Sequence, residues 1–332
     1  MTLNLVTGGA GFVGRRLVAA LLARGEAVRV LDLNPCPVDG AEAIVGSISN
    51  ATVVAEATRG ATRVFHLAGV ADLWARDPSV FERVNVEGTR TVLNAALAAG
   101  AERFVFCSSA TTLVGERAPI GISDVDETNV LAPDDLVGAY PRSKRRAELV
   151  VEAAAARGGP ALLVNPTAPL GPGADNLTPP TKMILDFVNG ATPAYIDCTL
   201  NFAPVDDLAA GMIAAATRGR PGERYILAGE DAPMRALLAT LADATGRPMP
   251  RLRLPYAAAR AVAAIDEGFV ARLTGAPPKA PIAGVKLAGR QTRFSRAKAA
   301  QALDWRSGPY EPALIAMLRW AREKGLTDAD VV

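Results

Sequence analysis

Two residues one helical turn apart, Tyr140 and Lys144 in the stretch GAYPRSK, are the first candidates for chemistry. Residues four apart share one face of a helix, so the Lys144 ammonium can lie near the Tyr140 phenol. An unperturbed tyrosine has a pKa of ~10, and a nearby cation favours its ionised form. The pair could therefore exchange a proton near neutral pH. The alternative interpretation is a polar turn that opens a helix.

Several hydroxyl groups precede that pair and could face the same ligand. The stretch FCSSATTLVG ends an apolar run and supplies Ser108, Ser109, Thr111 and Thr112. In a doubly wound sheet, ligands bind beyond the carboxyl ends of the strands, and this run ends in that position. A hydroxyl there can donate a hydrogen bond to a substrate carbonyl. A serine, a tyrosine and a lysine together suit a dinucleotide-dependent reaction.

A glycine-rich turn, VTGGAGFVGRR, follows the first apolar run and opens a helical pattern. Gly8, Gly11 and Gly14 have the spacing G-x-x-G-x-x-G. Glycines permit a tight turn, close approach to a pyrophosphate and close packing of helix on strand. The helix N-terminus offers free N–H groups to phosphates. The strand–turn–helix context favours a dinucleotide site over a turn without a ligand.

Asp32 ends the second apolar run and is a candidate for ribose recognition. A carboxylate there can accept hydrogen bonds from the ribose hydroxyls and would repel a 2′-phosphate, so it favours NAD over NADP. A solvated acid at a strand end is the alternative. In the later stretch FHLAG, small residues would let the backbone approach the cofactor. His66 in that stretch is predicted to be a packed histidine rather than a catalyst.

The elements that must carry these residues alternate between buried strands and helices. Helical patterns cover residues 12–25 and 85–100, and each ends at a glycine. Apolar residues dominate each predicted strand, as in a parallel sheet covered on both faces. The strands are Leu3–Thr7, Ala27–Asp32, Thr62–Gly69, Arg103–Ser109 and Ala161–Pro166. The alternation predicts an α/β fold, a Rossmann-type doubly wound parallel sheet with a smaller C-terminal substrate lobe.

The alternating pattern stops after about residue 167, where a loop rich in proline and glycine begins. Scattered helical patterns and one short strand, Arg224–Leu227, follow. We therefore predict a dinucleotide-binding domain over residues 1–167 and a mostly substrate-binding lobe over 168–332, with later segments free to return to the first domain. A cleft between the two would be the ligand site.

Composition limits the classes of function. The chain has 332 residues, half of them hydrophobic, and a formal net charge of +2, which gives no electrostatic case for nucleic acid. The N-terminus lacks a signal-peptide pattern, and the longest uncharged stretch is broken by prolines. Cys36, Cys107 and Cys198 are far apart and suggest reduced thiols in a cytoplasmic protein. A single histidine and no ligand spacing predict no metal site.

Taken together, these motifs resemble the extended short-chain dehydrogenase/reductases, also called the NAD-dependent epimerase/dehydratase family. The matching stretches occur in the family's order. They are TGGAGFVG, the Asp32 strand end, HLAG, NVEGT at Asn85–Thr89, SSA at Ser108–Ala110, and Y-x-x-x-K at Tyr140–Lys144.

The resemblance implies roles for individual residues. Ser109 would hydrogen-bond the substrate oxygen, Tyr140 would be the general acid/base, and Lys144 would lower the Tyr140 pKa and hold the nicotinamide ribose. The implied cofactor site comprises Gly8, Gly11, Phe12, Val13, Asp32, Ser47, Ile48, Leu67, Ala68, Gly69, Ser108, Tyr140, Lys144 and Pro166.

The second half looks similar to one branch of that family, the hopanoid-associated sugar epimerases, which are close to dihydroflavonol reductases and 3β-hydroxysteroid dehydrogenases. Three departures matter. Many relatives carry an acid where this chain has Ser47, and reductases often have a basic residue where this chain reads LDLN. Sugar-modifying members usually read RP and YGPG where this chain has NP and LGPG.

The residues also separate the candidate reactions. Dehydratases of the family carry an Asp–Glu pair after the active-site hydroxyl, where this chain has Ala110 and Thr111. An epimerase of nucleotide sugars needs cationic contacts to a diphosphate, but the apolar stretch 177–204 has only Lys182. Trp74 could form an apolar wall, although packing is the alternative.

We therefore expect an NAD(P)-dependent oxidoreductase that reversibly reduces a ketone or aldehyde on a fairly hydrophobic substrate. A 3-keto lipid of the sterol, hopanoid or sphingoid/ceramide type is the sharpest version, and a phenolic ketone stays open. The alternatives are an epimerase of nucleotide sugars and a non-catalytic dinucleotide-binding sensor or structural subunit.

One alanine-rich helical pattern, residues 256–273, has few charges. It could touch a membrane peripherally or pack on a second subunit, and a packed lobe helix is the alternative. A homodimer formed through two sheet-covering helices is implied only by the family resemblance.

Overall fold

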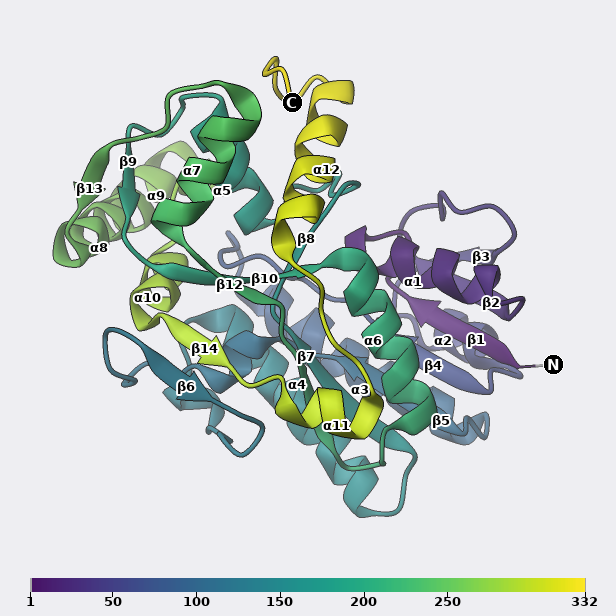
Figure 1. Cartoon of the computed structure of the whole chain (residues 1–332). Coiled ribbons are helices and arrows are strands. Elements are labelled where there is room, and N and C mark those ends of the chain that lie inside the picture. Colours follow the sequence, from purple (N-terminus) through teal and green to yellow (C-terminus); the bar gives the residue numbers. More distant parts are fainter. Residues whose placement is uncertain (1, 332) are drawn as a thin grey trace.

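The computed structural model describes residues 2–331, and a seven-stranded parallel sheet lies at its centre (Figure 1). The strand order is β11-β7-β5-β4-β1-β2-β3, and every neighbouring pair is parallel. The strands are β1 (Leu3–Thr7), β2 (Ala27–Asp32), β3 (Glu42–Val45), β4 (Arg63–His66), β5 (Arg103–Cys107), β7 (Ala161–Pro166) and β11 (Arg224–Leu227). The predicted Rossmann-type fold is confirmed.

Helices cover both faces of this sheet (Figure 1). On one face, α1 (Phe12–Ala23), α6 (Val205–Arg218) and α11 (Ala297–Leu303) bury aliphatic side chains against the strands. On the other face, α2 (Ala51–Thr58), α3 (Gly88–Ala98) and α4 (Ala139–Ala156) do the same. Strands covered on both faces have no solvent-facing side, which explains their near-continuous apolar sequences.

The strands predicted from sequence agree with the structure except at their ends. β1, β2 and β7 have the predicted bounds, whereas β4 and β5 end earlier than predicted, at His66 and Cys107. Beyond those points the chain leaves the sheet, and its small residues form loops at the carboxyl edge. β3 escaped prediction because its residues are mostly exposed at the sheet edge and form no apolar run.

The helix predicted over 85–100 has two parts. Residues Phe81–Glu87 form the π-helical segment η1, and α3 begins at Gly88. The wider turn surrounds Asn85, whose side chain bonds to another loop rather than to its own helix. Such π segments often occur at functional sites.

Residues after 167 build a second layer beside the sheet and also rejoin it. A second sheet has the order β12-β10-β8, formed by β12 (Glu230–Pro233), β10 (Thr199–Pro204) and β8 (Ala168–Leu170). It packs with α5 (Pro179–Val188), α7 (Met234–Thr245) and α12 (Tyr310–Glu323) around a separate core. Between these segments, α6 packs on α1 and β11 pairs with β7.

The remaining elements lie at the periphery. β9 (Ala194–Ile196) pairs with β13 (Leu252–Leu254), which leads into α8 (Tyr256–Ile265), the π-helical η4 (Asp266–Val270) and α9 (Ala271–Thr274). Next comes α10 (Ile282–Arg290), and then β14 (Thr292–Phe294), which pairs with β6 (Ser123–Val125). Two short 3₁₀ helices, η2 (Ala110–Leu113) and η3 (Pro133–Asp135), precede α4.

Candidate active site

The turn between β1 and α1 requires glycine at two positions. Gly8 has a φ of +76°, and a Cβ added there would lie 2.7 Å from the backbone N of Ala68. A Cβ on Gly14 would lie 2.0 Å from the carbonyl oxygen of Gly8. Both positions therefore need glycine to keep helix, strand and neighbouring loop in close contact.

The same turn fits the pyrophosphate of a dinucleotide. The N-cap residue of α1, Gly11, has no side chain to cap the helix, and Phe12, Val13 and Gly14 bring no acid to its first turn. The N–H groups of that turn and the positive end of the helix dipole therefore suit an anion. Phe12 and Val13 are both half-buried.

Asp32 lies at the carboxyl end of β2, beside this turn. Its carboxylate accepts hydrogen bonds from the backbone N of Ala10 and of Asn34, each at 3.0 Å. These bonds fix the carboxylate next to the glycine turn, which is where a ribose would need an acceptor. Asp32 therefore also stabilises the turn itself.

The other predicted cofactor residues follow β3 and β4. Gly46 donates to the carbonyl of Asp32, so Ser47 and Ile48 directly follow that contact. Ser47 is half-buried and Ile48 is buried against Gly88, the first residue of α3. Leu67 and Ala68 are half-buried and Gly69 is exposed, all in the loop after β4.

Asn85 ties that loop to α4, a link the sequence did not reveal. Its side chain accepts from the N of Val70 (2.8 Å) and donates to the Val70 carbonyl (3.0 Å) and to Ser143 Oγ (2.9 Å). A Cβ on Gly69 would lie 2.9 Å from Asn85 Oδ1. This buried amide therefore places the loop after β4 against the helix that carries Tyr140.

The structure brings Ser109, Tyr140 and Lys144 together where β5 ends and α4 begins. Ser109 is buried, and its hydroxyl forms hydrogen bonds with Thr111 Oγ1 (2.9 Å) and with Tyr140. Tyr140 is half-buried, and Lys144 is buried with its Nζ donating to the carbonyl of Cys107 at 2.7 Å. That ammonium also lies 4.3 Å from the centre of the Phe106 ring.

The electrostatics of this group differ from the sequence-based expectation. Burial raises the pKa of Tyr140 to about 12, and the hydrogen bond with Ser109 offsets only part of that rise. A lowered pKa was expected, but desolvation of the phenolate outweighs any help from Lys144. Burial also lowers the pKa of Lys144. Tyr140 therefore keeps its proton at neutral pH, as an unperturbed phenol also would.

Behind these residues lies a buried ionic network centred on Glu148, which sequence analysis missed. Glu148 is completely buried on α4, one turn after Lys144. Its carboxylate accepts from Ser108 Oγ (2.5 Å), Thr112 Oγ1 (2.9 Å), Asn165 Nδ2 (2.8 Å), Arg145 Nη1 (3.1 Å) and both terminal nitrogens of Arg224 (3.0 and 2.8 Å). Burial opposes its ionisation, but Arg224 and the other donors hold the Glu148 pKa below its ordinary value.

The Glu148 network affects two residues that were predicted to bind the cofactor, Ser108 and Pro166. The Ser108 hydroxyl points to Glu148, so it is engaged within the protein rather than offered to a ligand. Pro166, predicted near the nicotinamide, is half-buried at the end of β7, directly after Asn165 of the network. The spacing of Lys144 and Glu148 on one helix face was the available signal, but Arg224 comes from a distant strand.

His66 is a structural residue, as predicted. It is fully buried, and its ring nitrogens hydrogen-bond to Thr7 Oγ1 (2.7 Å) and Thr89 Oγ1 (2.9 Å). Burial, with a smaller contribution from Lys144, lowers the His66 pKa to about 3. The ring is therefore neutral and links β1, β4 and α3.

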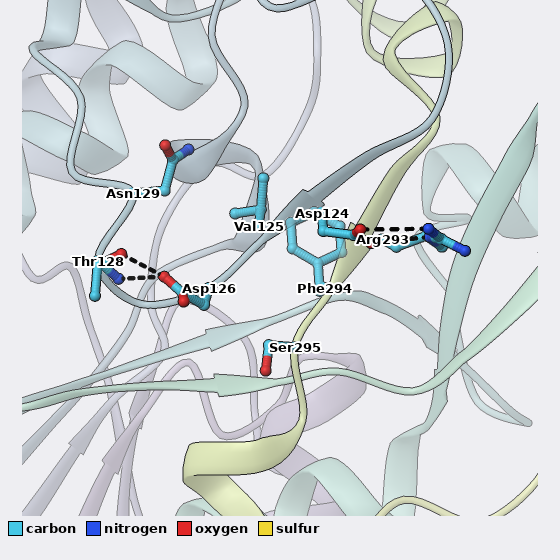
Figure 2. A pocket seen from close by; sticks show the side chains of 8 residues that line it. All are labelled: Asp124, Val125, Asp126, Thr128, Asn129, Arg293, Phe294 and Ser295. Carbon is cyan, nitrogen blue, oxygen red and sulfur yellow. Dashed lines mark hydrogen bonds and ion pairs between the residues drawn. The ribbon is translucent and has the colours of Figure 1, made fainter.

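A separate open hollow of about 590 Å³ lies beside β6 and β14 (Figure 2). Its lining comprises Asp124, Val125, Asp126, Thr128, Asn129, Arg293, Phe294 and Ser295. None of these is a predicted site residue. Asp124 already pairs with Arg293 (2.9 Å), and Asp126 already accepts from Thr128. We assign no ligand to this hollow.

Across residues 2–331, no helix combines the length and hydrophobicity needed to cross a bilayer. Within the same range, no three His, Cys, Asp or Glu side chains gather as a metal site would require.

Comparison with known proteins places this arrangement in context. The profile described as "NAD dependent epimerase/dehydratase family" matches residues 4–228. A protein of Synechocystis sp. named "Putative dihydroflavonol 4-reductase" is 34% identical over 96% of this chain and 94% of its own. A Stigmatella aurantiaca protein, 4-hydroxy-2-methyl-3-oxo-4-farnesyl-3,4-dihydroquinoline-1-oxide ketoreductase, is 31% identical over 91% of both chains. The crystal structure of gox2253 is 34% identical, covers 99% of this chain and 100% of its own, and superposes with a TM-score of 0.83.

Proposed function

This chain belongs to the NAD-dependent epimerase/dehydratase family, and on that premise we propose that it reduces a carbonyl group on a hydrophobic molecule. It is an NAD(P)-dependent oxidoreductase. The proposed reaction is the reversible reduction of a ketone or aldehyde. Its sharpest form takes a 3-keto lipid of the sterol, hopanoid or sphingoid/ceramide type.

The observation that carries this proposal is the neutral, half-buried phenol of Tyr140 in contact with Ser109. Carbonyl reduction needs a proton donor at the oxygen, and a phenol that is protonated at neutral pH and lies beside Ser109 can supply one. Lys144 lies one helical turn away, where its charge would stabilise the phenolate left after transfer. A sensor that only binds dinucleotide would not need this set.

NAD(P) supplies, when bound, a hydride donor or acceptor at its nicotinamide ring. This chain's residues would hold it with the N–H groups of the glycine turn, with Asp32 at the ribose and with the Ala68–Gly69 backbone. Ser109 would orient the substrate oxygen by donating a hydrogen bond, and Tyr140 would give that oxygen its proton. Asp32 supports a preference for NAD over NADP.

Sequence analysis based the expectation of a hydrophobic substrate on the apolar stretch 177–204, but the structure gives that stretch another role. The apolar stretch 177–204 mostly builds the lobe core, since Ile184, Leu185, Phe187 and Phe202 are buried there. Those residues therefore say little about the ligand. The support comes instead from the loop after β4, where Leu73 and Trp74 are half-buried, and from the farnesyl group in the name of the ketoreductase relative.

The competing epimerase reaction is less well supported by the same region. Lys182, the only basic residue of 177–204, already pairs with Asp186 at 2.6 Å. An epimerase would need free cations there for a sugar diphosphate.

We propose that residues 1–167, joined by α6 and β11, bind the dinucleotide and that most of the remaining chain from 168 onward forms the substrate side.

A substrate screen tests the proposal. NADH and NADPH oxidation would be followed with 3-keto lipids, phenolic ketones and UDP-sugars. We expect cofactor turnover with at least one hydrophobic ketone and a preference for NADH. Isomerisation of a UDP-sugar without net cofactor turnover, and no ketone reduction, would contradict it.

A further inference from the structure

The segment formed by α8, η4 and α9 exposes an unusual set of large apolar side chains. Val262, Ile265, Phe269, Val270 and Leu273, here called the apolar face, are between 43% and 72% exposed. Their spacing places most of them on one side of the continuous helical segment. Scattered exposed apolar residues need no explanation, but a contiguous group that includes Phe and Leu marks an interaction surface.

The opposite side of the same segment is packed, so the apolar face is not a loosely folded region. Ala259 and Ala263 are buried against Val285 of α10. A Cβ on Gly289 of α10 would lie 2.2 Å from the ring of Tyr256. The segment thus has two unlike faces: small residues pack against the lobe, and large apolar residues face outward.

The acids and the bases near the apolar face differ in what they bond to. The two acids of the segment each accept a hydrogen bond from a backbone N–H, Asp266 from Lys279 (2.7 Å) and Glu267 from Ile282 (2.8 Å). Exposed basic side chains lie beside the segment: Arg76, whose guanidinium would be 3.6 Å from a Cβ on Gly275 after α9, and Lys279, whose backbone N bonds to Asp266. Large apolar residues with cations beside them are the pattern of a helix that lies in the interface of an anionic membrane.

We propose that the apolar face docks the protein onto an anionic phospholipid bilayer. The charge arrangement favours lipid over a second copy of this chain. A two-fold contact through the apolar face would bring together the Arg76 side chains of both copies, which lie beside Gly275 at the end of α9, and like charges there repel. An anionic headgroup would instead pair with each of these cations.

The position of the docking surface suits delivery of a lipid to the candidate active site. A Cβ on Gly275, just after α9, would lie 3.6 Å from the Arg76 guanidinium, and one on Gly284 of α10 would lie 3.2 Å from Leu73. A Cβ on Gly138, the N-cap of α4, would lie 2.9 Å from Ala283. The docked segment therefore adjoins the loop after β4, and α10, on which it packs, adjoins the start of the helix that carries Tyr140. This delivery role rests on the proposed function, whereas docking itself does not.

Vesicle co-sedimentation of the full chain tests docking without any assay of activity. We expect binding to phosphatidylglycerol vesicles that weakens as salt rises, and much weaker binding to phosphatidylcholine. The double variant Phe269→Ser/Leu273→Ser should bind on the order of 10-fold or more weaker, because two apolar side chains lose their burial in lipid. Arg76→Glu should weaken binding to phosphatidylglycerol selectively.

Leu149→Ser, at an exposed leucine on α4, is the matched control and should bind like the wild type. Circular dichroism and thermal unfolding would verify that each variant is folded. The proposal is overturned if wild-type protein stays in the supernatant, or if the double variant binds as tightly as the wild type. A vesicle-independent dimer that the double variant abolishes, without vesicle binding, would overturn it in favour of a second copy. A failed ketone screen would leave a positive vesicle result intact.

Discussion

Burial keeps two ring side chains near the candidate site neutral. His66 cannot gain a proton easily because its ring is enclosed, and Tyr140 cannot lose one easily for the same reason. His66 supports the sheet, and Tyr140 keeps its proton. Sequence analysis anticipated the packed role of His66 from its place at a strand end. The raised pKa of Tyr140 was not foreseeable, because burial depends on the loops that fold over it.

The pH dependence of stability should report on His66, the only histidine of the chain. Its folded pKa is lowered from 6.5 to about 3, so the unfolded chain takes up a proton below pH 6.5 while the folded protein does not. Stability is therefore lost as the pH falls through that window. This single group should cost about 2 kcal/mol of unfolding free energy on going from pH 7 to 5.

Urea unfolding of the wild type and of His66→Gln at pH 7 and at pH 5 tests this predicted loss of stability. The variant should be less stable at pH 7 and lose less stability on acidification. Equal losses in the two proteins would show that His66 does not titrate as stated.

The choice between NAD and NADP can be tested at Asp32. Asp32→Asn keeps an acceptor for the glycine turn but removes the charge that repels a 2′-phosphate. We expect the ratio of NADH to NADPH affinity to fall by roughly 10-fold, the effect of about 1.4 kcal/mol. Binding titrations with both cofactors measure it, and an unchanged ratio would remove Asp32 from cofactor discrimination.

At the scale of elements, sequence periodicity predicted the strands and helices that place the site. Buried strands such as β1, β2 and β7 have apolar runs that only a doubly covered sheet explains. β3 and η1 lacked such signals, since one is an exposed edge strand and the other depends on the contacts of Asn85. The Glu148 network was hidden because Arg224 reaches it from β11, which is distant in sequence.

That network should stabilise the junction of α4, β7 and β11. Glu148→Gln keeps the shape but leaves Arg224 and Arg145 with less compensating charge in a buried place. Removing one partner of a buried ion pair costs about 3–5 kcal/mol of stability. Glu152→Gln is the matched control, because Glu152 pairs with the same arginines but its side chain is 31% exposed.

Chemical denaturation of both variants gives the comparison. A smaller loss is expected for Glu152→Gln, since solvent screens that carboxylate. Equal, small losses in the two variants would contradict the central place of Glu148.

At the scale of the whole molecule, one chain folds back so that its later half completes the sheet begun by its first half. β11 forms one edge of the sheet and α6 covers one face (Figure 1), while α10 lies beside the start of α4. The sequence predicted the order of the first half, a strand at Arg224–Leu227 and the freedom of later segments to return, but a run as short as β11 carries too little signal to say where in the sheet it pairs. The arrangement places the glycine-rich turn, the Tyr140 phenol and an outward apolar face on connected elements.

The most direct test of the account is hydride transfer in the Tyr140→Phe variant. NADH binding and single-turnover oxidation would be measured with the best ketone from the screen. Because Phe lacks only the proton-donating hydroxyl, binding should persist while the rate falls by roughly 10²–10⁴-fold. A variant that binds NADH and reduces the ketone at the wild-type rate would contradict the assignment of Tyr140 as the proton donor.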